Sequence, residues 1–103
     1  MSIPIKWNEE AVRVGFKTYV QTGNTAVKIY SNAGTPFETA SLNLPDKQPA
    51  DIVALKTEGA VGSATNDALA QALLDAGIVE SLGQTVTVDG VSGLMCRIVK
   101  REG

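Results

Sequence analysis

Residues 66–80 form the one stretch of this sequence with a clear helical periodicity, and the rest of the chain has to fold around it. Gly77 stands where a closing residue with positive φ is needed, and Ile78 can supply the hydrophobic contact of such a cap. We therefore predict a helix over residues 66–76 with one buried face. Its apolar residues fall at the i, i+3, i+4 and i+7 positions that share this face: Leu69, Ala72, Leu73 and Ala76.

Alternating apolar and polar residues predict short strands before this helix. The runs Val12–Val20, Thr25–Tyr30 and Phe37–Leu44 are separated by turns that contain Gly and Asn. Consecutive strands joined by tight turns form an antiparallel meander. Ile3–Trp7 adds a short strand whose proline suits the edge of a sheet.

The residues after the helix predict a hairpin, because Asp89-Gly90 is a strong turn signal between the runs Gln84–Val88 and Leu94–Val99. The expected fold is α+β and two-layered, an antiparallel β-sheet of about five or six strands with one main helix packed on one face. Residues 1–103 contain no repeat or long linker and are expected to form a single small globular domain. The predicted core contains Val14, Phe16, Val27, Ile29, Leu42, Val86 and Ile98.

Composition narrows the classes of function. The formal net charge of −2 gives no overall attraction to phosphate backbones or anionic lipid, which argues against nucleic acid and membranes as partners. The chain has no histidine and no metal or cofactor motif, so we predict no cofactor, no metal and no enzymatic activity. Cys96 is the one cysteine and is expected to be a small buried residue. With no evident signal peptide, this predicts a cytoplasmic protein, in the host cytoplasm if a phage encodes it.

One candidate binding face lies on the outward side of the first two strands of the meander. Basic and aromatic side chains alternate there, an arrangement that can stack on single-stranded nucleic acid and neutralise it. The simpler interpretation is the ordinary solvated side of an antiparallel sheet. The residues of this candidate face are Arg13, Lys17, Tyr19, Lys28 and Tyr30.

Trp7 is the one tryptophan of the chain and has two interpretations. The first is a plug over one end of the core, because aromatic side chains mainly supply buried area. The second is an exposed interface anchor, since tryptophan is enriched at binding hot spots, and for this reason Trp7 joins the candidate binding residues.

The second half of the chain resembles a family of small uncharacterised proteins, a domain of unknown function carried by bacteria, bacteriophages and mobile elements. The similarity covers residues 24–98 and implies a shared fold, with no inherited site. Small acidic proteins of mobile elements often bind a host protein, for instance to block a defence nuclease, and the resemblance implies such a setting. The pieces that carry it are Leu-Asn-Leu-Pro (42–45), Ala-Leu-Lys-Thr (54–57), Ala-Leu-Leu-Asp-Ala-Gly-Ile-Val-Glu (72–80), Gly-Gln-Thr-Val (83–86) and Cys-Arg-Ile (96–98).

Three functional hypotheses follow. The first is a non-enzymatic accessory protein that binds a host or phage protein, for instance as an inhibitor of a host defence system. The second is a single-stranded nucleic-acid-binding protein that uses the basic and aromatic sheet face. The third, an enzyme with a carboxylate-based site, would need clustered Asp and Glu in a pocket. A homo-oligomer is also open, through an edge strand such as Ile3–Trp7 or the last strand.

Overall fold

The computed structural model describes residues 3–7, 10–58, 60–61 and 64–101. Its elements in chain order are β1 (Ile3–Trp7), β2 (Glu10–Thr18), β3 (Thr25–Ser31), β4 (Pro36–Thr39), β5 (Ser41–Leu42), β6 (Ile52–Lys56), β7 (Ala60–Val61), β8 (Ala64–Thr65), α1 (Asn66–Asp75), β9 (Val79–Val88) and β10 (Val91–Ile98).

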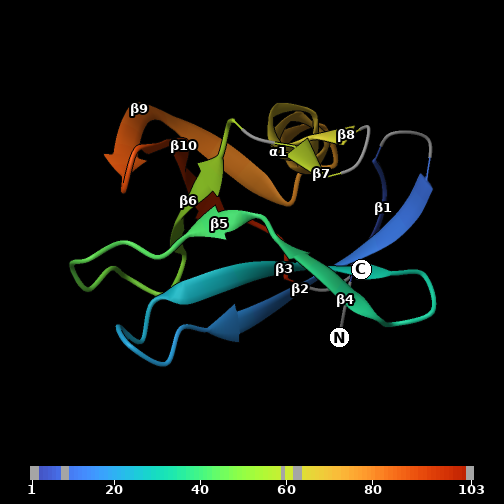
Figure 1. Cartoon of the computed structure of the whole chain (residues 1–103), viewed down its shortest axis with the longest axis horizontal. Helices are drawn as coiled ribbons and strands as arrows, with labels where there is room; N and C mark the ends of the chain where they lie inside the picture. The colour runs from blue at the N-terminus through green and yellow to red at the C-terminus, as the bar shows by residue number, and fades with distance from the viewer. Residues whose placement is uncertain (1–2, 8–9, 59, 62–63, 102–103) are drawn as a thin grey trace.

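The strands form two four-stranded antiparallel sheets, ordered β1-β2-β3-β4 and β5-β6-β10-β9, and β7 pairs separately with β8. Figure 1 shows the two sheets stacked, with α1 on the side of the second sheet. The predicted α+β class with antiparallel strands is confirmed. The strands divide, however, between two sheets of four where the sequence predicted one sheet of about five or six.

The two sheets are joined at a corner centred on Ala40, between β4 and β5. The Ala40 N–H donates to the Val27 carbonyl of the first sheet at 2.8 Å, and its own carbonyl accepts from Lys56 of the second sheet at 2.8 Å. The Ser41 hydroxyl then accepts from the Val27 N–H at 2.9 Å, which satisfies that donor where the chain leaves the first sheet. The predicted strand Phe37–Leu44 is therefore one bent segment shared by both sheets, and this bend divides the meander.

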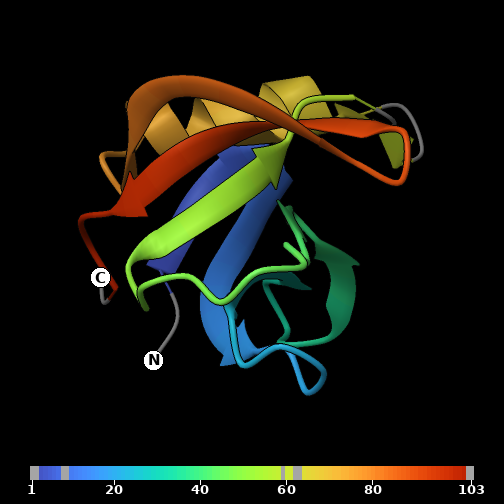
Figure 2. The same cartoon turned by 90° about the vertical axis from the view of Figure 1, so that its left-hand side faces the viewer.

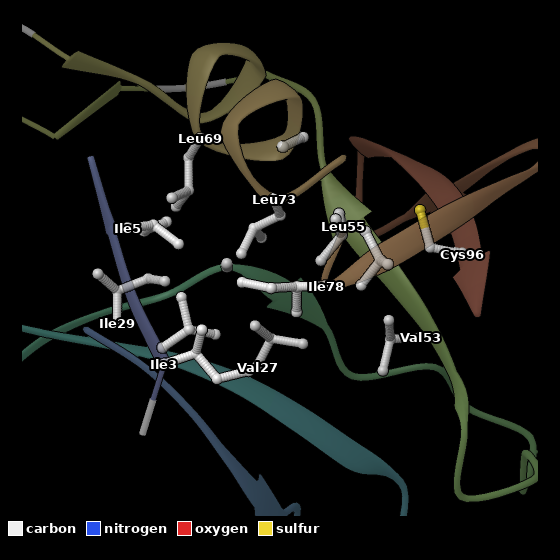
Figure 3. Close-up of a cluster of buried hydrophobic side chains, with 14 of the residues drawn as sticks. Ile3, Ile5, Val27, Ile29, Val53, Leu55, Leu69, Leu73, Ile78 and Cys96 are labelled. Atoms are coloured by element: carbon white, nitrogen blue, oxygen red, sulfur yellow. The ribbon is translucent and has the colours of Figure 1, made fainter. Parts of the chain in front are cut away.

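Helix α1 packs against β1, β6 and β9, and so closes the side where the two sheets separate (Figure 1). Leu69 and Leu73 point from the helix into the core, as Figure 3 shows. Ala70 is buried beside them, whereas Ala76 is exposed. The predicted helix and its buried face are confirmed, except that the apolar stripe stops one turn earlier than the sequence pattern.

The end of the helix follows the predicted cap. Gly77 has a φ of 72°, which a residue with a Cβ rarely adopts. Its N–H donates to the Leu74 carbonyl at 3.1 Å, and the Ile78 N–H donates to the Leu73 carbonyl at 3.2 Å. These are the two hydrogen bonds of a Schellman cap. Ile78 is fully buried, so the cap also delivers an apolar side chain to the core.

A large apolar cluster lies between the two sheets and α1 (Figure 3), and a small one lies on the opposite face of the second sheet. Four predicted core residues lie in the large cluster, and Phe16 packs against it. Leu42 and Val86 instead belong to the small cluster, because they lie on the face of the second sheet that looks away from the first. The four predicted core residues that lie in the large cluster are Val14, Val27, Ile29 and Ile98.

The C-terminal hairpin is formed by β9 and β10 and closed by Asp89 and Gly90. Both residues have positive φ, 51° and 81°, as a type I′ turn requires. β10 pairs with β6 on one side and β9 on the other, so the last strand is not an edge, contrary to the prediction. Ile3–Trp7 is an edge as predicted, and the other edges of the two large sheets are β4, β5 and β9.

The buried thiol of Cys96 makes stability depend on pH. Cys96 lies fully buried in the large cluster, as predicted (Figure 3), and burial raises the pKa of its thiol from 9.0 to about 11. The contribution of the neutral thiol to the free energy of unfolding is fully present below pH 9.0. It is lost as the pH rises toward 11, because the unfolded chain releases the thiol proton first. We expect the free energy of unfolding to fall by about 1.4 kcal/mol per pH unit in this window.

Urea unfolding at about pH 8 and about pH 10 measures this change, and Cys96→Ala is the control. The variant is expected to be less stable at both values but to lose less stability between them. Equal losses in the two proteins would show that the thiol does not contribute.

Candidate functional site

The outward side of the first sheet carries a group of basic residues. In the β2–β3 ladder, Arg13 lies opposite Tyr30 and Gly15 lies opposite Lys28, so their side chains share one face. Lys17 follows two residues after Gly15 on the same face, while the alternate residues of both strands face the core. Arg13, Lys17, Lys28 and Tyr30 are named the basic face below.

Tyr30 stands at the centre of the basic face because Gly15 leaves space for it. A Cβ on Gly15 would lie 2.8 Å from Tyr30 Cε2, but 3.6 and 3.7 Å from Cδ2 and Cζ. These distances mean that the ring reaches Gly15 with its edge. Gly15 was not among the predicted site residues, although a glycine inside an alternating strand often marks a close approach by another group.

Two hollows lie beside Tyr30 and share it as a wall. The first, of about 460 Å³, is lined by Arg13, Gly15, Phe16, Lys17, Tyr30 and residues 32–34. The second, of about 540 Å³, is lined by Lys17, Lys28, Tyr30, Pro36, Glu38 and Thr39. Each hollow therefore combines the aromatic ring with two cationic side chains.

The charge of the basic face is opposite in sign to that of the chain as a whole. It gathers three of the nine Lys and Arg residues of a chain whose formal net charge is −2. Lys28 Nζ donates to Thr39 Oγ1 at 2.6 Å, which fixes the ammonium group beside the second hollow. Glu38 lines this hollow too, but its Oε1 lies 3.8 Å from Lys56 Nζ of the other sheet. Lys56 therefore offsets the charge of Glu38, the one carboxylate among the described residues that line the two hollows.

Two of the six candidate binding residues are not on the basic face. Trp7 is 4 % exposed and belongs to the large cluster, so the structure supports the core interpretation and removes it from the surface.

Tyr19 is the second of these residues. β2 ends at Thr18, and Tyr19 lies in the following turn beside Val20, which is 96 % exposed. The Tyr19 hydroxyl lies 3.0 Å from the Ser41 carbonyl, to which it donates, and 2.8 Å from the Ser41 hydroxyl. Burial raises the pKa of Tyr19, and the Ser41 hydrogen bond partly offsets this.

A second concave surface, which sequence analysis missed, lies on the outer face of the second sheet. This cleft, of about 840 Å³, runs between the loop of residues 43–48 and the far half of β9. Its apolar part consists of Leu44, Pro45, Val86, Val88 and Met95. The side chains lining it in the described part of the chain include Asp46 and Asp89 but no cation. The signal in the sequence was the pair of prolines, which marks the loop but not the strand that it faces.

One wall of the cleft is fixed by Asn24, which is 3 % exposed. Its Nδ2 donates to the carbonyls of Leu44 at 3.1 Å and Asp46 at 2.9 Å. Its Oδ1 accepts from the Gln48 N–H at 2.7 Å. Lys47, the cation of this loop, turns toward the other side, where its Nζ donates to the Gly23 carbonyl at 2.7 Å. The turn between β2 and β3 therefore holds this wall of the cleft in place.

Two carboxylates lie near the Arg97 guanidinium. Arg97 Nη1 lies 3.0 Å from Glu80 Oε1, and Arg97 Nε lies 3.7 Å from Asp51 Oδ2. No group of three or more Cys, Asp and Glu side chains that could hold a metal ion occurs in the described part of the chain. Within the same residues, no helix has the length and apolar character needed to cross a membrane.

Comparison with known proteins found no match to a protein-family model, a curated protein or a solved structure. The resemblance to a family of phage and mobile-element proteins therefore stays a prediction.

Proposed function

We propose that this protein is a non-enzymatic binding protein that holds single-stranded nucleic acid on the basic face. The observation that carries the proposal is the Tyr30 ring, which stands edge-on over Gly15 between two hollows bordered by Arg13, Lys17 and Lys28. Bases stack on aromatic rings regardless of sequence, and nearby cations neutralise the phosphates. The formal net charge of −2 argued against nucleic acid, but binding depends on the local charge of the contact surface.

The proposal is tested by fluorescence anisotropy with a labelled oligo-dT of about 20 nucleotides in a salt series. Three cations predict a slope of log K against log salt of about −2, which is a loss of affinity of about twentyfold between about 50 and 200 mM salt. Lys28→Ala should make this slope shallower by about 0.7. Tyr30→Ala should weaken binding by about five- to a hundredfold, and Tyr30→Phe should retain most of it.

Lys100→Ala is the matched control, because it removes the same charge from an exposed residue after β10 in the other sheet. Gly15→Val tests the placement of the ring, since it displaces Tyr30 and leaves every charge in place. Binding that is independent of salt, or an equal loss in Lys28→Ala and Lys100→Ala, would refute the proposal.

A protein partner is the second candidate, in line with an accessory protein of a mobile element that binds a host protein. The cleft between residues 43–48 and β9 favours it, because an apolar floor with a polar rim suits the side chains of another polypeptide. The two candidates use different surfaces. A substitution of Tyr30 should therefore weaken binding of nucleic acid, and a substitution of Met95 should weaken binding of a protein partner. The single cysteine fits a cytoplasmic setting for either one.

A further inference from the structure

The edges of the two large sheets differ in how well they are protected against pairing with another strand. β1 has five residues and contains Pro4 and Lys6. β4 has four residues, begins with Pro36 and pairs irregularly with β3. β5 has two residues, with Pro45 close behind. Short length, proline, charge and irregular pairing are the features by which natural edges avoid association.

From Thr85 to Val88, β9 lacks these features: it pairs regularly with β10 and contains no proline and no charged residue. The register shift with β10 and the positive φ of Gly83, 74°, lie before this stretch of the ten-residue strand. No strand pairs with its outer side within the part of the chain that the structure describes. Figure 1 shows this part of β9 running out past α1 toward the turn with β10. Figure 2, turned by 90°, shows the same strand along the border of the second sheet.

We propose that Thr85–Val88 is a dimerisation edge, at which a second copy of this chain adds its own β9 in antiparallel orientation. A second copy fits because this stretch is uncharged and can lie opposite itself without repulsion. In a two-fold pairing centred on Val86, Thr85 lies opposite Thr87 of the second copy, and Val88 lies opposite Gln84. No two like charges meet, and pairs of β-branched residues stabilise neighbouring strands.

The same pairing extends the small apolar cluster across the dimer. Val86 and Val88 are half-buried, and they lie on the outer face of the second sheet together with Leu42 and Met95. A two-fold axis perpendicular to the sheet keeps this face on the same side in both copies. The valines of one copy therefore lie beside those of the other, while Thr85 and Thr87 lie exposed along the strand.

The test is the mass in solution by sedimentation velocity over a dilution series. The expected result is twice the mass of one chain at high concentration and a single chain on dilution. The double variant Thr85→Lys with Thr87→Lys places like charges opposite each other, and Thr85→Glu with Thr87→Glu does the same with negative charge. Each alone should raise the dimer dissociation constant at least about tenfold.

Mixing the two double variants should restore a dimer, because each lysine then faces a glutamate. This rescue separates repulsion at the edge from damage to the fold. Gln21→Lys with Ala33→Lys adds the same charge at exposed turn positions and should leave the dimer intact. A wild-type chain that stays monomeric up to about 1 mM would overturn the proposal, and so would a mixture that fails to associate.

Discussion

Replacing Asn24 with aspartate is expected to lower the free energy of unfolding by about 3–5 kcal/mol. The amide of Asn24 uses all its polar atoms at a site that is 3 % exposed, with Nδ2 donating to the Leu44 and Asp46 carbonyls. Asn24→Asp replaces this donor with an oxygen, so two backbone carbonyls lose their partner and face a buried charge. Urea unfolding at about pH 7 measures the loss.

Asn43→Ala is the control for Asn24→Asp, because it removes another hydrogen bond between the same turn and loop. Thr22 Oγ1 donates to Asn43 Oδ1 at 2.8 Å, but Asn43 is only partly buried. Water can replace this bond, so the expected loss is less than about 1 kcal/mol. Equal losses in the two variants would mean that the buried amide does not hold the loop of residues 43–48.

Replacing Leu73 with alanine is expected to cost about 3–5 kcal/mol, because the fully buried side chain leaves a cavity between α1 and the two sheets. Figure 3 shows Leu73 pointing toward Ile78 and Leu55, which come from the helix cap and from β6. One side chain thus joins the helix and its cap to a strand of the second sheet.

Leu74→Ala tests whether this loss comes from the cavity or from the helix itself. Leu74 is the next residue of the helix and is half-buried against the same cluster, so its truncation should cost about 1–2 kcal/mol. Thermal and urea unfolding should rank the two variants in this order. A larger loss for Leu74→Ala would contradict the orientation of α1.

Local patterns predicted the local structure of this chain. The apolar spacing around Leu73, the Gly77 cap and the Asp89-Gly90 turn each depend on residues within a few positions of one another, and each is found where expected. The alternation in β2 and β3 also placed Arg13, Lys17, Lys28 and Tyr30 on one face. Period-two alternation fixes which residues share a face, whatever the order of the strands.

The arrangement of the strands depended on contacts that no local pattern records. Ala40 turns the chain from one sheet to the other because Val27 and Lys56 bind its two sides. The same bend places Leu42 in the small cluster, on the outer face of the second sheet. Tyr19 lies off the predicted face, and its hydroxyl donates a hydrogen bond to the Ser41 carbonyl, twenty-two residues away.

Chemical-shift mapping tests whether the basic face is the surface that contacts nucleic acid. ¹⁵N-labelled protein would be titrated with unlabelled oligo-dT of about 20 nucleotides at low salt, with amide shifts followed residue by residue. We expect the largest shifts to fall on Gly15, Lys17, Lys28 and Tyr30 and to disappear in Tyr30→Ala. No shifts at all, or shifts confined to Val86, Val88 and Met95 around the cleft, would contradict this expectation.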